Sequence, residues 1–149
     1  APGPERDLKV NAARPEIGSF LERTPKSHPL FVQASTDLGW CYKLKGEMDV
    51  ARQYLQGAME AQPAHPSAYT LLSLMYREAG MPDEAIKALQ KGNDATKGKS
   101  AEIQYNLGLM MLEGGDLEAA RKHARAAYKL GYPLQKLKQK LTEQGAWTD

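Results

Sequence analysis

Histidine and cysteine, the residues that most often carry out chemistry, are few in this chain and stand far apart. The histidines are His28, His65 and His123, and the single cysteine is Cys41. A zinc site needs three or four such ligands close together, and no two of these histidines have the four-residue spacing that would pair them on one helix. A lone cysteine has no partner for a disulfide within the chain. These residues therefore indicate no metal site and no nucleophilic centre.

Two of the histidines stand directly before proline, in His28-Pro29 and His65-Pro66. Proline is tolerated at the start of a helix, where its missing N–H would have no partner anyway, so both histidines are interpreted as loop residues before a helix. No glycine-rich phosphate loop, nucleophile elbow or spaced carboxylate pair is present, and Gly114-Gly115 is interpreted as a turn between helices. The sequence predicts no enzyme activity and no cofactor.

The remaining candidate for a functional site is a charged surface, because basic residues gather in the last third of the chain. Residues 116–140 contain only two acids, Asp116 and Glu118. The bases are Arg121, Lys122, Arg125, Lys129, Lys136, Lys138 and Lys140. Such a face can meet an anionic partner, but the favoured interpretation is a solvated outer helix face. The net charge of only +2 and the lack of interleaved aromatic residues argue against nucleic acid, and no apolar run is long enough to span a membrane.

The chain repeats itself. Gly46, Gly80 and Gly115 lie 34 and 35 residues apart, and the same two steps separate Ala51, Ala85 and Ala120. A fixed period of this size is typical of stacked helical repeats. Each unit is predicted to form two amphipathic helices joined at the glycine. The small residues are predicted to let the two helices approach closely.

The recurring pattern resembles the tetratricopeptide repeat, in which Leu-Gly, Tyr, a turn glycine and Ala follow one another. The matching residues are Leu38-Gly39, Tyr42, Gly46 and Ala51 in the first repeat, Leu72-Ser73, Tyr76, Gly80 and Ala85 in the second, and Leu107-Gly108, Gly115 and Ala120 in the third. The departures include Gln104 in place of an aromatic residue, Met111 in place of Tyr and Gly92 in place of Ala.

The resemblance implies an all-α fold, a right-handed superhelix of antiparallel helix pairs called an α-solenoid. The 149 residues suit one domain. Residues 1–14, rich in proline and charge, are predicted to be a loosely ordered lead-in. The rest forms one domain over residues 15–149, with a short helix at 15–24, repeats at about 32–65, 66–99 and 101–134, and a capping helix at about 134–144. Leu134, Leu137 and Leu141 are predicted to form the buried face of that capping helix.

The resemblance also implies a partner-binding groove lined by the first helix of each repeat. The family's groove positions carried over to this chain are Gln33, Thr36, Trp40, Lys43, Thr70, Leu74, Arg77, Glu102, Tyr105, Leu109 and Leu112. An apolar line of Trp40, Leu74 and Leu109 inside a charged rim is what a peptide or helix of another protein needs. In the alternative interpretation, Trp40 and Leu109 partly fill the stack or contact the N-terminal segment.

The function predicted in this way is that of an adaptor or scaffold that binds another protein within a multiprotein assembly. A bacterial envelope or secretion machine is one setting that the resemblance suggests, and both periplasm and cytoplasm are compatible with the sequence. Self-association into a homodimer and electrostatic docking through the basic last third stay open as alternatives. Binding of chaperone tails is not expected, because the clamp positions of that subclass hold Thr36, Trp40, Leu71, Glu102 and Asn106 instead of its Lys, Asn and Arg residues.

Overall fold

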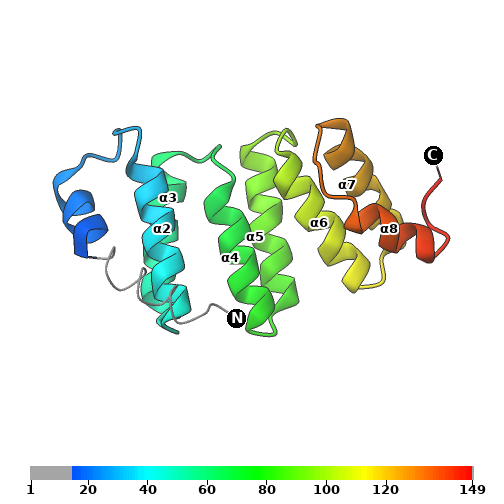
Figure 1. Cartoon of the computed structure of the whole chain (residues 1–149), viewed down its shortest axis with the longest axis horizontal. Coiled ribbons are helices and arrows are strands. Elements are labelled where there is room, and N and C mark those ends of the chain that lie inside the picture. Colours follow the sequence, from blue (N-terminus) through cyan, green and yellow to red (C-terminus); the bar gives the residue numbers. More distant parts are fainter. Residues whose placement is uncertain (1–14, 149) are drawn as a thin grey trace.

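A computed structural model of the chain describes residues 15–148, which form a row of helices (Figure 1). The predicted lead-in at residues 1–14 lies outside the described part. A helix over residues 15–23 comes first. It is followed by α2 (Phe31–Leu44), α3 (Met48–Ala61), α4 (Ser67–Glu78), α5 (Pro82–Ala95), α6 (Ala101–Glu113), α7 (Leu117–Lys129) and α8 (Lys136–Glu143). Between residues 15 and 148 there is no strand.

The helices pack in pairs, and the pairs stack side by side along the long axis of the molecule (Figure 1). Helix α2 pairs with α3, α4 with α5, and α6 with α7. We call the first member of each pair the A helix and the second the B helix. The second and third A helices also contact the A and B helices of the preceding pair. This arrangement confirms the predicted all-α solenoid, in which each repeat contacts only its neighbours.

Glycine closes each A helix at the turn into its B helix. Gly46, Gly80 and Gly115 have φ angles of 78°, 73° and 84°, in the left-handed region that costs glycine nothing and other residues a steric penalty. The recurring glycine is thus a requirement of the backbone at the same point of every repeat.

Small residues allow the A and B helices to approach closely. A Cβ atom built on Gly39 would lie 3.4 Å from the carbonyl oxygen of Ala51 and 2.9 Å from Leu55 Cδ2. On the third pair, a Cβ atom on Gly108 would lie 3.3 Å from the carbonyl oxygen of Ala120. A Cβ atom at these positions would touch the backbone of the paired helix, and the equivalent position of the second repeat holds the small, buried Ser73. The predicted role of small residues in the close approach of the helices agrees with the structure.

A buried polar cluster around Gln104 accounts for one departure from the family pattern. Gln104 Nε2 donates to Asn93 Oδ1 at 3.0 Å and to the carbonyl oxygen of Gly98 at 3.1 Å. These two acceptors fix the orientation of the amide, so its Oε1 accepts from Nδ1 of His123 at 2.8 Å. Lys97 and Gly98, in the longer loop between repeats two and three, have positive φ angles. The amide at position 104 thus holds the loop that contains the extra residue.

The capping helix begins later than predicted. Helix α8 starts at Lys136, so Leu134 precedes it and is 57% exposed, whereas Leu137 and Leu141 are fully buried. The prediction that all three leucines share one buried face is therefore wrong for Leu134. The chain leaves α7 through Gly131 and Pro133, and that turn takes up the residues predicted to form the first turn of the helix. None of the helices within residues 15–148 is long and apolar enough to cross a lipid bilayer.

Candidate binding hollow on the face of the A helices

The face formed by the three A helices carries a depression of about 380 Å³, which we call the hollow. Each of α2, α4 and α6 contributes to its lining, so it runs across all three repeats. The lining residues are Thr36, Asp37, Trp40, Thr70, Leu71, Leu74, Glu102 and Asn106.

The floor of the hollow is apolar and well supported. Trp40 and Leu74 are partly buried against the main core, to which the buried Leu71 belongs. The Trp40 ring also lies under the ammonium of Lys43, whose Nζ is 4.9 Å from the ring centroid. Lys43 is held in turn by Glu78 of α4, with 2.8 Å between Nζ and Oε2. The indole is therefore positioned by the core and by Lys43 before any ligand arrives.

The polar side chains of the lining present mainly acceptor atoms. The hydroxyl of Thr36 donates to the carbonyl oxygen of Val32 at 2.8 Å, and that of Thr70 donates to the carbonyl oxygen of Ser67 at 3.0 Å. A hydroxyl has one hydrogen, so each threonine oxygen keeps only its acceptor capacity. Asn106 Nδ2 donates to the carbonyl oxygen of Glu102 at 2.9 Å, which leaves Oδ1 as an acceptor.

The two cations of this face already have anionic partners. Lys43 pairs with Glu78, and Arg77 of α4 pairs with Glu113 of α6. Both pairs connect neighbouring A helices. They fix the A helices relative to one another and cancel the positive charge beside the hollow.

The two carboxylates in the lining, in contrast, have no cationic partner in the part of the chain that the structure describes. Neither Asp37 nor Glu102 forms an ion pair with any residue between 15 and 148. Asp37 Oδ1 accepts one hydrogen bond, from Gln33 Nε2 at 2.8 Å. The hollow therefore has an apolar floor with two acids, Asp37 on α2 and Glu102 on α6, that form no ion pair among the described residues. The same part of the chain holds no cluster of His, Cys, Asp and Glu that could bind a metal ion.

The sequence matches the tetratricopeptide repeat profile three times, over residues 8–66, 45–98 and 76–131. The chain belongs to the tetratricopeptide repeat (TPR) family. TPR arrays are protein-interaction scaffolds, as the resemblance implied.

Comparison with curated proteins gives no significant match. Among solved structures, a thermophilic TPR protein of Thermus thermophilus is 20% identical, with a TM-score of 0.69 over 96% of this chain and 78% of its own. MamA is 22% identical, with a TM-score of 0.60 over 90% of this chain and 67% of its own. PilW, a type IV pilus biogenesis factor, is 19% identical, with a TM-score of 0.66 over 91% of this chain and 60% of its own. At these identities the likeness shows the shared TPR fold.

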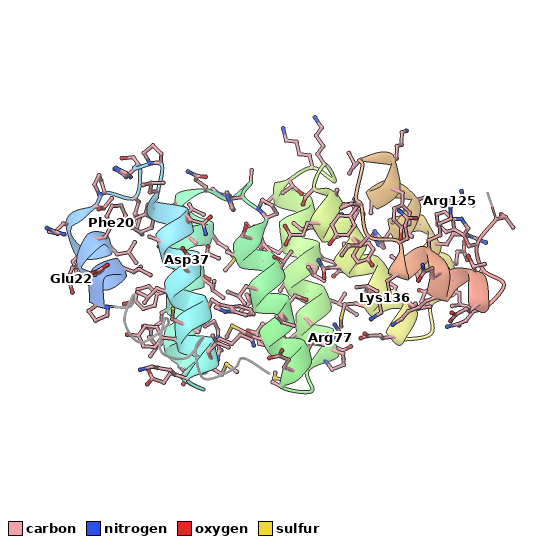
Figure 2. The ribbon with its side chains drawn as sticks, viewed as in Figure 1. Phe20, Glu22, Asp37, Arg77, Arg125 and Lys136 are labelled. Carbon is pink, nitrogen blue, oxygen red and sulfur yellow. The ribbon has the colours of Figure 1, made fainter. Side chains whose placement is uncertain are left out.

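Five of the residues carried over from the TPR groove lie together in the hollow: Thr36, Trp40, Thr70, Leu74 and Glu102. Lys43 and Arg77 stand beside it as members of the two ion pairs. Gln33 lines a separate depression of about 310 Å³ between the first helix and α2, with Ile17, Phe20 and Leu30. Figure 2 shows Phe20 on the first helix and Asp37 on α2, and Asp37 lines both depressions.

The other three carried-over residues do not reach the hollow, because the C-terminal cap covers them. Tyr105 is 4% exposed, its ring stacks on Tyr132 with 4.2 Å between centroids, and its hydroxyl accepts from the backbone N–H of Leu137 at 3.3 Å. Leu112 is also buried, and Leu109 packs against the same group of residues. We call this group the cap cluster; its buried members are Tyr105, Leu112, Ala120, Ala124, Ala127, Leu137 and Leu141.

The carried-over positions missed three lining residues: Asp37, Leu71 and Asn106. They are separated by 34 and 35 residues, the same steps as the turn glycines. Each therefore occupies the same position of its TPR repeat. On α2 this position lies four residues after Gln33 and three before Trp40, which is the spacing of one helix face. That spacing is the signal by which these residues could have been found.

Part of the basic last third holds the chain's own C-terminal segment. Arg125 Nη2 donates to the carbonyl oxygen of Thr148 at 2.6 Å, and the guanidinium lies 4.8 Å from the centroid of the Trp147 ring. Lys138 approaches the same ring at 5.6 Å. Figure 2 shows Arg125 and Lys136 at the C-terminal end of the array, far from Asp37. The basic residues are thus separate from the hollow.

Proposed function

We propose that this TPR array binds an extended or helical segment of another protein in the hollow, as a scaffold within a larger assembly. The observation that carries the proposal is that three different repeats contribute to one hollow with an apolar floor and a polar rim. A site shared by three A helices can bind a segment that crosses the array.

The size and lining of the hollow favour a few side chains over a large ligand. A volume of about 380 Å³ is near the lower end for small-molecule sites. An indole supported by the core and by Lys43 is a rigid aromatic surface, and such residues often dominate the energy of an interface. We expect an apolar side chain of the partner to pack against Trp40 and Leu74 while the backbone of the partner runs over the rim.

The setting is a further part of the proposal. PilW is named as a type IV pilus biogenesis factor, and this agrees with the bacterial envelope setting that the sequence suggested. The shared fold supports a scaffold of this kind without identifying the partner.

The test uses peptides selected from a displayed random library on the full chain. The sequence has two tryptophans, so a Trp147→Phe variant leaves Trp40 as the single one, and its fluorescence reports directly on the hollow. Peptides that bind the hollow should change that fluorescence. In the wild-type background, the double variant Trp40→Ala, Leu74→Ala should reduce their affinity by about tenfold or more while the helical circular dichroism signal remains.

The matched control is Leu130→Ala, which also truncates a large apolar side chain, one that is 44% exposed at the end of α7. It should leave peptide binding unchanged. Equal binding to the wild type and to the Trp40, Leu74 variant would place the binding site elsewhere and reject the proposal.

A further inference from the structure

We infer that the segment bound in the hollow carries a lysine or arginine next to its apolar anchor. The inference rests on the proposed function, because it specifies the chemistry of the partner at the same site. Three features of the hollow carry it: the acceptor atoms of the lining, its charge, and the position of its apolar floor.

The free hydrogen-bonding atoms of the lining are mainly acceptors, so they favour a ligand that donates hydrogen bonds. The hydroxyl hydrogens of Thr36 and Thr70 are already engaged with backbone carbonyls of their own helices, and the amide of Asn106 is oriented by its bond to the carbonyl oxygen of Glu102. Both threonine oxygens and Asn106 Oδ1 can therefore accept hydrogen bonds from a ligand. An ammonium group brings three donors and no acceptor, and a guanidinium brings five.

The lining of the hollow is negatively charged, so it favours a cationic group on the ligand. The eight lining residues include two acids, Asp37 and Glu102, and no Lys or Arg, which makes a formal charge of −2 at the hollow. The whole chain has a net charge of +2, so the sign at the hollow is opposite to that of the molecule. The nearby cations Lys43 and Arg77 form ion pairs with glutamates, Glu78 and Glu113, and not with these two acids.

A partner without a cation would be penalised on closing the hollow. Covering Asp37 or Glu102 with an uncharged segment removes water from a carboxylate and supplies no compensating partner. A like charge would be repelled as well. The two acids therefore disfavour neutral and acidic segments at the same time as they attract basic ones.

The placement of the acids sets the order of side chains in the partner. Asp37 belongs to α2 and Glu102 to α6, while Leu71 and Leu74 on the intervening α4 and Trp40 on α2 form the floor. A segment that crosses from α2 to α6 meets an acid, then the apolar floor, then the second acid. The expected sequence is accordingly an apolar residue with a basic residue on at least one side.

The experiment compares peptide selections on the wild type and on a charge-neutral hollow. Peptides selected on the full wild-type chain from a displayed random library should pair Lys or Arg with an apolar residue. The variant Asp37→Asn, Glu102→Gln should weaken these peptides by about tenfold or more. Their affinity for the wild type should also fall as the salt concentration rises. The control Glu22→Gln, Glu143→Gln removes two exposed acids outside the hollow and should change neither affinity nor salt dependence.

The outcomes separate this inference from the proposed function. Peptides that depend on Trp40 and Leu74 but lack a basic residue, or that bind the charge-neutral variant as well as the wild type, would overturn the inference and leave the hollow as the binding site. Peptides that bind the Trp40→Ala, Leu74→Ala variant unchanged, or a selection that yields no binder, would overturn both.

Discussion

The second and third repeats place the same positions of the A helix in opposite environments. On α4, Thr70 and Leu74 line the open hollow. Their equivalents on α6, 35 residues later, are Tyr105 and Leu109, and both belong to or pack against the cap cluster. The two helices occupy the same place in their repeats, yet these two positions are open to a partner on α4 and covered on α6, although Glu102 and Asn106 of α6 still line the hollow.

The difference comes from the element that succeeds each repeat in the chain. Helix α4 is succeeded by another complete pair, which stacks beside it and leaves its A face open. Helix α6 is contacted by α8, which inserts Leu137 next to Gly108, where an added Cβ would lie 2.5 Å from Leu137 Cδ2. The last repeat of a solenoid needs such a cover for its apolar surface. A position in a repeat therefore acquires its role from the neighbouring element.

The largest effect is expected where α8 closes the third repeat. Leu137→Ala removes a fully buried side chain from the cap cluster and should lower the free energy of unfolding by about 2–5 kcal/mol. Leu134→Ala is the matched control, because Leu134 is 57% exposed; it should change stability by no more than about 0.5 kcal/mol. Denaturant unfolding followed by circular dichroism measures both. Equal effects would mean that α8 does not cover α6.

A smaller effect is expected for the hydroxyl that joins α6 to α8. Tyr105→Phe keeps the ring on Tyr132 but leaves the buried backbone N–H of Leu137 without its acceptor, at a cost of about 1–3 kcal/mol. Tyr132→Phe is the control, since no residue from 15 to 148 forms a hydrogen bond with the Tyr132 hydroxyl, and it should be close to neutral. Thermal unfolding distinguishes the two. A neutral Tyr105→Phe would show that the hydroxyl does not contribute to closing the third repeat.

The local features of the fold could be predicted from the sequence because each depends on nearby residues. The turn at Gly80 needs only a left-handed residue between two helices, and the contact at Gly39 follows from a repeated small residue. The start of α8 could not be predicted in this way: the leucine spacing places Leu134 on the same helix face as Leu137, and only the turn through Pro133 shows that the helix has not yet begun.

The site was predictable to the extent that the repeats are equivalent. Trp40 and Leu74 were placed on one face by carrying over repeat positions, and the structure brings them together. The same procedure failed for Tyr105 and Leu109, because the helix that covers them lies about 30 residues further along the chain and does not belong to the repeat. Asp37 was missed for a different reason, since the carried-over positions include Thr36 and Trp40 on either side of it but not position 37 itself.

The stability of the third repeat should depend on pH through His123, which lies on its B helix, α7. Burial, together with the charge of Lys122, lowers the pKa of His123 below its ordinary value. The unfolded chain therefore binds a proton more readily than the folded chain, and the free energy of unfolding should fall as the pH drops below about 6.5 toward the lowered pKa. The loss should be smaller in His123→Gln, which cannot titrate. Denaturant unfolding at several pH values between about 7.5 and 5 measures it. Parallel pH profiles for the two proteins would contradict this account of His123.

The smallest effect is expected on the open side, at Arg77. Its side chain is 46% exposed and pairs with Glu113, which is 38% exposed, so Arg77→Ala should lower the free energy of unfolding by about 1 kcal/mol or less, and by still less at high salt. The equivalent residue 35 positions later is Leu112, which is 9% exposed in the cap cluster. Leu112→Ala should therefore cost several times as much in the same denaturant titration. If the two substitutions destabilise the chain equally, the two equivalent positions are packed alike, and the cap cannot be what removes Leu112 from the binding surface.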